Sequence, residues 1–148
     1  THNPQLSLLN QYVYVYCLNE GSITHSYRPR LAPRYLALLD IYRRQLVQLD
    51  RLEEFRDLMA FLVLRFISTC CHNEYLYAPD RYAAIKGQLA ELMASDIVQS
   101  ALQEVARGDH IRAISTRNHT YTRLQASLLR HGMIGAVARL RMLRLSFM

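Results

Sequence analysis

Cysteine is scarce in this 148-residue chain, and its placement excludes a disulfide framework. The chain has three cysteines, an odd number, and two of them are adjacent, Cys70 and Cys71. Paired CxxC spacing of the kind that holds structural zinc is absent. Adjacent cysteines on a helix project about 100° apart, so we expect both in the core rather than on a metal. These features predict a reducing compartment and a fold held by a hydrophobic core.

Long apolar runs and targeting signals are also missing. The most hydrophobic stretch, Phe55 to Cys71, is interrupted by three charged residues, whereas a helix needs about 20 apolar residues to cross a bilayer. No leader with a charged start and an apolar core marks a secretory signal. These absences predict a cytoplasmic globular protein. Because the sequence starts at Thr1 without an initiator methionine, we also expect it to be part of a longer chain.

Lysine is nearly absent, since Lys86 is the single lysine among 18 basic residues and the net charge is +6. The planar guanidinium group of arginine binds phosphates well, which would suit nucleic acid, anionic lipid or a phosphorylated ligand. The basic residues are scattered along the chain rather than massed in one run. We therefore predict no dedicated nucleic-acid surface.

One β-strand is predicted near the start of the chain, from Tyr12 to Leu18. Its tyrosines alternate with valines and a cysteine, so the two kinds of side chain fall on opposite faces. Gly21 then supplies the conformational freedom of a tight turn, and the hydroxyl-rich run Ser22 to Ser26 follows. Backbone amides and hydroxyls in such a turn can hold an anion. The alternative is a turn that only ends the strand.

The segment Tyr12 to Ser26, YVYVYCLNEGSITHS, resembles the end of the catalytic domain in bacterial family 2 glycosyltransferases. In that family a tyrosine-rich strand runs into a glycine, serine, isoleucine, threonine turn before a C-terminal helical region. The resemblance implies a GT-A type α/β domain and sugar transfer from a nucleotide donor in surface polysaccharide or lipopolysaccharide assembly. It implies nucleotide-sugar contacts at Gly21, Ser22 and Thr24. The chain departs from the pattern after the tyrosines, where the family often has an arginine.

Catalytic carboxylates are missing from the sequence. Metal-assisted glycosyl transfer uses paired carboxylates for the cation and another as base, yet none of the six aspartates forms an Asp-x-Asp motif. The acidic pair Glu53 and Glu54 lies at the start of the predicted central helix, where acids offset the helix dipole. We therefore predict no catalytic residue, metal site or cofactor here. The parent enzyme would hold Mg or Mn and the nucleotide sugar in an N-terminal catalytic domain, and this chain alone would be inactive.

The remaining sequence predicts a mainly α fold, a multi-helix bundle preceded by the one short strand and turn. We expect a boundary after a proline-rich linker, with residues 1–32 as strand, turn and linker and residues 33–148 as the helical domain. Apolar spacing and capping residues predict helices over residues 34–50, 55–71, 81–93, 95–107 and 109–130 and after Gly132. Residues 55–71 are apolar on every face, so we expect this helix at the centre of the bundle. We expect residues 73–79 to form the loop that follows it.

The last helix carries arginines beside bulky apolar residues. We expect it to dock on the core with its arginines in water; alternatively Arg139, Arg141 and Arg144 contact a partner or lie on an anionic membrane at the inner face of the plasma membrane.

The unpaired edge of the strand at Tyr12 predicts a homodimer. A stand-alone helical protein-interaction module without catalysis is the alternative to a transferase.

Overall fold

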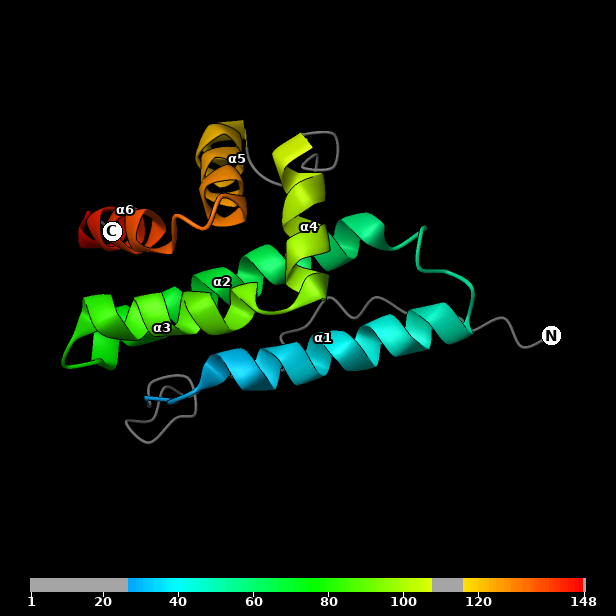
Figure 1. The fold of residues 1–148 in the computed structure, drawn as a ribbon, viewed down its shortest axis with the longest axis horizontal. Coiled ribbons are helices and arrows are strands. Elements are labelled where there is room, and N and C mark those ends of the chain that lie inside the picture. The colour runs from blue at the N-terminus through cyan, green and yellow to red at the C-terminus, as the bar shows by residue number, and fades with distance from the viewer. Residues whose placement is uncertain (1–26, 108–115, 148) are drawn as a thin grey trace, which may run out of the picture.

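The computed structural model describes residues 27–107 and 116–147, and these residues form a helical bundle (Figure 1). The predicted mainly α fold is thereby confirmed. The predicted strand from Tyr12 to Leu18 and the turn residues Gly21, Ser22 and Thr24 lie outside the described residues. The described helices are α1 (Leu31–Gln48), α2 (Arg56–Tyr77), α3 (Arg81–Met93), α4 (Asp96–Arg107), α5 (Thr116–Arg130) and α6 (Ile134–Ser146).

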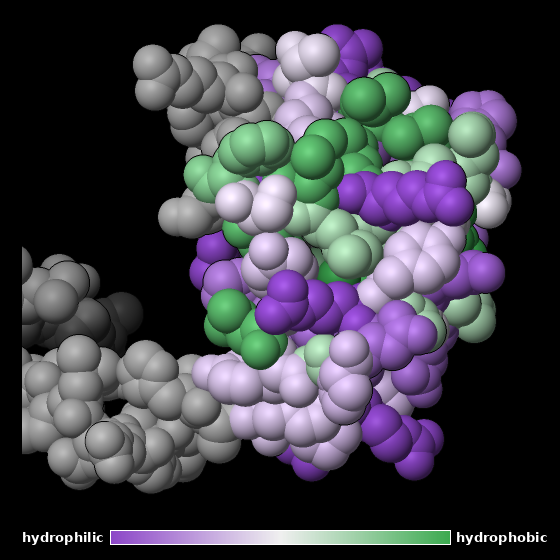
Figure 2. Space-filling view, turned by 90° about the vertical axis from the view of Figure 1, so that its left-hand side faces the viewer, coloured by the Kyte–Doolittle hydropathy of each residue, from purple (hydrophilic) through white to green (hydrophobic). Residues whose placement is uncertain are grey.

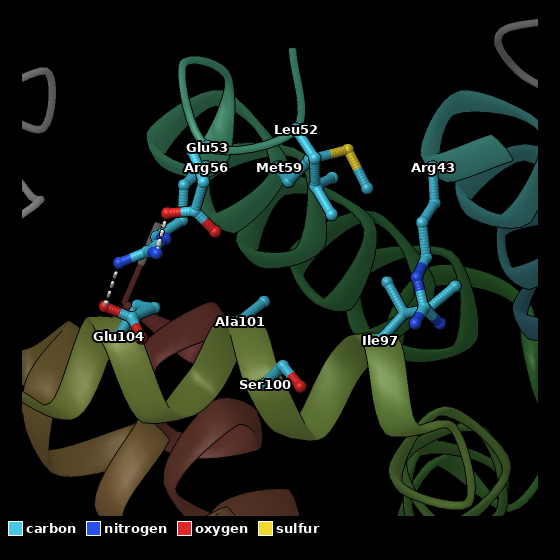
Figure 3. Close-up of a pocket in the computed structure, with 9 residues that line it drawn as sticks. All are labelled: Arg43, Leu52, Glu53, Arg56, Met59, Ile97, Ser100, Ala101 and Glu104. Atoms are coloured by element: carbon cyan, nitrogen blue, oxygen red, sulfur yellow. Dashed lines mark hydrogen bonds and ion pairs between the residues drawn. The ribbon is translucent and has the colours of Figure 1, made fainter. Parts of the chain in front are cut away.

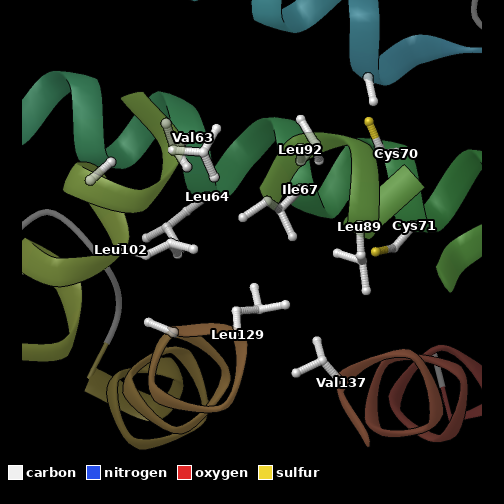
Figure 4. Packing of buried hydrophobic residues seen from close by; sticks show 14 of the residues in the cluster. Val63, Leu64, Ile67, Cys70, Cys71, Leu89, Leu92, Leu102, Leu129 and Val137 are labelled. Atoms are coloured by element: carbon white, nitrogen blue, oxygen red, sulfur yellow. The ribbon is translucent and has the colours of Figure 1, made fainter. Parts of the chain in front are cut away.

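The central helix of the bundle is α2, which contacts α1, α3, α4 and α6. Its buried side chains meet those of the surrounding helices in one apolar cluster (Figure 4). Val63 and Ile67 of α2 are each 1% exposed, because neighbouring helices cover them. The prediction that the Phe55 to Cys71 stretch lies at the centre is confirmed. The other members labelled in the figure are Leu64, Cys70, Cys71, Leu89, Leu92, Leu102, Leu129 and Val137.

The helices are arranged in three layers (Figure 1). Helix α1 contacts α2 and α3 on one side of the middle layer. Helix α6 contacts the same two helices from the other side, and α5 packs on α4 and α6. The middle layer therefore separates the start of α1 from α6.

Local chemistry explains several of the helix boundaries. The side chain of Asp80 accepts a hydrogen bond from the N–H of Ala83 at 3.0 Å and so caps the start of α3. Gly132 ends α5 with a φ of 72°, a conformation that glycine adopts without steric cost. Helix α1 begins at Leu31, inside the expected linker, because Pro33 sits in the first turn, where its missing N–H costs no helical hydrogen bond.

The predicted loop at residues 73–79 is wrong for most of its length, because α2 continues to Tyr77. The polar composition of this segment is typical of a loop. Asn73 and Glu74 are nevertheless buried, at 8% and 1% exposure. They are stable in the interior because their polar atoms find hydrogen-bond partners far away in the sequence.

Both α2 cysteines are buried in the core, as predicted, and their sulfurs point to different sides of the helix (Figure 4). Burial raises the pKa of Cys71 to about 11, although the charge of Arg141 offsets part of this effect. Burial also raises the pKa of Cys70. The thiolate forms are disfavoured because the apolar core solvates them poorly.

The thiol pKa values predict a loss of stability at high pH. In the unfolded chain the thiols ionise near a pKa of about 8.5, so the unfolded state releases their protons at lower pH than the folded state does. The free energy of unfolding is therefore expected to fall as the pH rises from about 8.5 to about 11. Urea unfolding of the wild type and of a Cys70→Ala/Cys71→Ala variant checks this. The variant should show a shallower pH dependence, and equal slopes would contradict the assignment.

Candidate functional site

A surface hollow lies between α1, α2 and α4, beside the turn that joins α1 to α2 (Figure 3). Its volume is about 230 Å³. Apolar side chains form much of its lining and charged side chains surround them. The apolar members are Leu52, Met59, Ile97 and Ala101, and the charged members are Arg43, Glu53, Arg56 and Glu104.

The charges around the hollow are largely paired with one another. Arg56 forms ion pairs with Glu53 and, at 3.9 Å, with Glu104. Arg43 pairs with Asp96 at 3.2 Å, just outside the lining. Because both arginines already face carboxylates, the hollow suits a small apolar group with polar edges better than an anion.

The acidic pair predicted at the start of the central helix lies just before α2 and has a structural role. Glu53 pairs with Arg56, and Glu54 accepts a hydrogen bond from Arg51 Nε at 2.7 Å. The hydrogen bond from Arg51 lowers the pKa of Glu54. No group of three or more metal-type ligands occurs within residues 27–107 and 116–147.

A partly buried polar clamp holds the start of α1 against α2 and α3. Asn73 binds both polar groups of the Arg28 backbone: the Arg28 N–H donates to Asn73 Oδ1 at 3.2 Å, and Asn73 Nδ2 donates to the Arg28 carbonyl at 3.0 Å. Gln88 on α3 accepts a hydrogen bond from the Ala32 N–H at 2.9 Å. This contact satisfies one of the N–H groups that the first turn of a helix leaves without an internal partner.

Glu74 joins the parts of the clamp. Its carboxylate accepts hydrogen bonds from Gln88 Nε2 at 3.0 Å, from Asn73 Nδ2 at 3.3 Å and from the Tyr27 hydroxyl at 3.1 Å. Partial burial and then the nearby carboxylate raise the pKa of Tyr27. Because three donors surround Glu74, the cost of removing the carboxylate from water is reduced. The clamp therefore consists of Tyr27, Arg28, Asn73, Glu74 and Gln88.

The clamp fixes the point at which the chain enters the bundle. The predicted nucleotide-sugar residues Gly21, Ser22 and Thr24 lie three to six residues before Tyr27. The clamp is not predicted by the sequence because the polar composition of residues 73–79 is typical of a loop. A usable signal was present, since Ile67, Cys70 and Glu74 continue one helical face at spacings of three and four residues.

The three arginines predicted on the last helix lie in different environments. Arg139 is exposed, with its guanidinium carbon 5.7 Å from the ring centroid of Tyr82. Arg144 is half-buried, 4.1 Å from the ring centroid of Tyr121. Arg141 is only 8% exposed and faces the interior. The three side chains therefore do not form one surface row, and their contact with a membrane or partner stays a prediction.

Arg141 is a buried cation bound by neutral oxygen atoms. Its Nη2 donates to Gln125 Oε1 at 2.7 Å and its Nη1 donates to Ser68 Oγ at 3.3 Å. Among the described residues, the buried atoms Arg141 Nε and Gln125 Nε2 have no hydrogen-bond partner. Burying a charge without a carboxylate partner is costly. This cluster therefore fixes the orientation of α6 against α2 and α5 more than it adds to the stability of the fold.

No protein-family model matches the chain, and no curated protein or solved structure matches it either. In the part of the chain that the structure describes, no helix combines the length and apolarity needed to cross a bilayer. Residue chemistry and geometry thus carry the functional assignment.

The clamp predicts a specific response to loss of the Gln88 amide. A Gln88→Leu substitution removes the acceptor for the Ala32 N–H and one donor to Glu74, so unfolding free energy should fall by about 2 kcal/mol. Hydrogen exchange at the Ala32 amide should accelerate. The matched control is Gln45→Leu on the exposed face of α1, which should change stability by less than about 0.5 kcal/mol. Equal effects at both sites in urea unfolding would contradict a clamp.

The Arg141 cluster predicts an asymmetry between its two members. Arg141→Met keeps much of the side-chain volume and removes the buried charge, so we expect stability to be unchanged or raised by about 1 kcal/mol. Gln125→Met leaves the cation without its shortest hydrogen bond and should cost about 2 kcal/mol. Thermal or urea unfolding of both variants measures the difference. A larger loss for Arg141→Met would show that the arginine is net stabilising.

Proposed function

We propose that this chain is the C-terminal helical part of a bacterial family 2 glycosyltransferase, which moves a sugar from a nucleotide donor in surface polysaccharide or lipopolysaccharide assembly. The resemblance of Tyr12 to Ser26 to the end of that catalytic domain is the origin of the proposal. The clamp at Tyr27 and Arg28 is the structural observation that supports it. The bundle would act as the scaffold behind the donor site.

The clamp supports the proposal because a turn that binds a diphosphate has to be held in place. Small errors in the position of binding groups reduce catalysis strongly. Asn73 and Glu74 fix the chain directly after the segment that would carry Ser22 and Thr24. A loop whose end is already ordered loses less entropy when a ligand binds.

The chemistry proposed for the turn is hydrogen bonding to phosphate oxygens. The hydroxyls of Ser22 and Thr24 and the backbone amides after Gly21 would donate these bonds. The N-terminal catalytic domain would supply the acidic residues that hold Mg or Mn and activate the acceptor. In this arrangement the helical chain contributes positioning and no catalytic group.

A second candidate function is a protein-interaction module, and the hollow between α1, α2 and α4 is the observation that favours it. Its apolar lining and its paired charges fit a protruding apolar side chain of a partner protein. This module would require no nucleotide. Nucleotide binding by the full-length protein therefore separates the two functions.

Nucleotide binding is expected to depend on the turn hydroxyls. In the full-length protein, Ser22→Ala and Thr24→Ala should each raise the dissociation constant for a nucleoside diphosphate by about tenfold, because a hydrogen bond to a charged group contributes about 1.5 kcal/mol. Calorimetric titration with UDP and GDP in the presence of Mn²⁺ measures this, and a transfer assay with nucleotide sugars follows activity. Thr120→Ala, at an exposed position of α5, is the control. Absence of nucleotide binding, or equal affinity in all variants, would refute the transferase proposal.

A further inference from the structure

Acidic residues stop at Asp109, although arginines continue to the end of the chain. Residues 1–109 contain eleven basic and twelve acidic residues, whereas residues 110–148 contain seven arginines and no acidic residue. The arginines are spread along the sequence, but the carboxylates that would neutralise them are not. The whole net charge of +6 thus arises from the part that includes α5 and α6.

The ion pairs between described residues all use arginines and carboxylates from before Asp109. Arginines in the first part of the chain pair with nearby carboxylates, as Arg43 does with Asp96 and Arg44 does with Asp40. Helices α5 and α6 contain no acidic residue with which to form such pairs internally. A surface with cations and without carboxylates attracts an anionic partner.

The outer face of α6 also exposes large apolar side chains. Arg139 and Leu143 are four residues apart and so lie on one side of α6, and Phe147 is the residue at which the helix ends. Leu143 is 57% exposed and Phe147 is 83% exposed. In Figure 2, hydrophobic and hydrophilic side chains lie side by side in the upper part of the view, where α5 and α6 are located. Arg139, Leu143 and Phe147 are called the α6 face below.

Helix α5 repeats the combination of an exposed apolar residue and an exposed cation. Leu124 is 49% exposed and its neighbour Arg123 is also exposed. Apolar side chains beside arginines are typical of helices that lie in the plane of a membrane, with the apolar groups among the acyl chains and the cations at the lipid phosphates. Phosphate contacts in a nucleic acid would use the arginines but leave the leucine and phenylalanine side chains in water.

We infer that the α6 face binds the surface of a membrane rich in anionic lipid. With 13 residues, α6 is about 20 Å long, so it lies along such a surface rather than across it. Arg139 contacts lipid phosphates, and Leu143 and Phe147 enter the boundary between headgroups and acyl chains. This binding is a property of α6 and does not depend on the transferase proposal. Together, the two proposals place sugar transfer where a lipid-linked acceptor is within reach.

Vesicle flotation of the purified 148-residue chain tests the inference. The chain should float with vesicles of phosphatidylcholine that contain phosphatidylglycerol, should bind vesicles of phosphatidylcholine alone much more weakly, and should lose binding as salt screens the charges. Arg139→Glu should weaken partitioning by about tenfold, because it removes one cation near the surface and adds an anion. A Leu143→Ser/Phe147→Ser variant should also lose binding while its circular dichroism spectrum stays helical.

Matched changes on α1 and at the residue that follows it serve as controls. Arg34→Glu makes the same change of charge on an exposed α1 residue, and Leu49→Ser makes a similar apolar-to-polar change at a site 66% exposed. Both should bind anionic vesicles within about twofold of the wild type. Equal losses in the controls, equal binding to neutral vesicles, or binding to duplex DNA without binding to vesicles would each overturn the inference. Nucleotide titration is a separate measurement, so failure of flotation and failure of the transferase proposal can be told apart.

Discussion

The hydrogen bonds to the Glu74 carboxylate determine how three parts of the molecule meet. A carboxylate that is 1% exposed is stable only when its oxygens are well bonded. Its donors come from the segment before α1, from α2 and from α3. The hydrophobic effect brings these elements together, but it has no direction. The polar contacts therefore select one arrangement among the compact ones that burial alone would permit.

This selection matters because α2 is apolar around most of its circumference. A helix with one apolar stripe is oriented by that stripe, whereas burial of α2 alone would tolerate several rotations about its axis. Asn73 and Glu74 near its end and Ser68, which accepts from Arg141, each require a particular neighbour. These polar contacts specify both the rotation of α2 and the docking of α1 and α6 against it.

The sequence allowed the helices to be predicted wherever the decisive interactions are local. The cap at Asp80 acts within three residues, and Gly132 ends a helix through its own backbone. The extension of α2 to Tyr77 depends instead on partners such as Gln88 and Arg28, which are 14 and 45 residues away. Such pairings cannot be read from local composition. The inward position of Arg141 was missed for the same reason, since Gln125 lies on another helix.

Parts of the candidate site were predictable to different degrees. The turn at Gly21 stays a prediction from its residue pattern, and the mixed basic and apolar character of the last helix is visible in its composition. The hollow between α1, α2 and α4 could not be predicted from the sequence, because Met59 and Ile97 come together only when the helices pack. The lack of acidic residues after Asp109 is visible in the sequence. It gives one side of the bundle an excess of cations only because α5 and α6 lie together on one side of the middle layer.

The layered arrangement links the two proposals. The clamp holds the chain at the start of α1, on one side of the α2 and α3 layer, and α6 lies on the other side. Packed helices are about 8–10 Å apart between axes, so two steps between layers separate the axes of α1 and α6 by roughly 20 Å. With α6 on a membrane, the bundle would act as a spacer of that thickness between the lipid surface and the start of α1, which the predicted turn precedes in the sequence. A rigid spacer needs specified rotations and directions of its helices, and the contacts of Glu74 and Arg141 provide them.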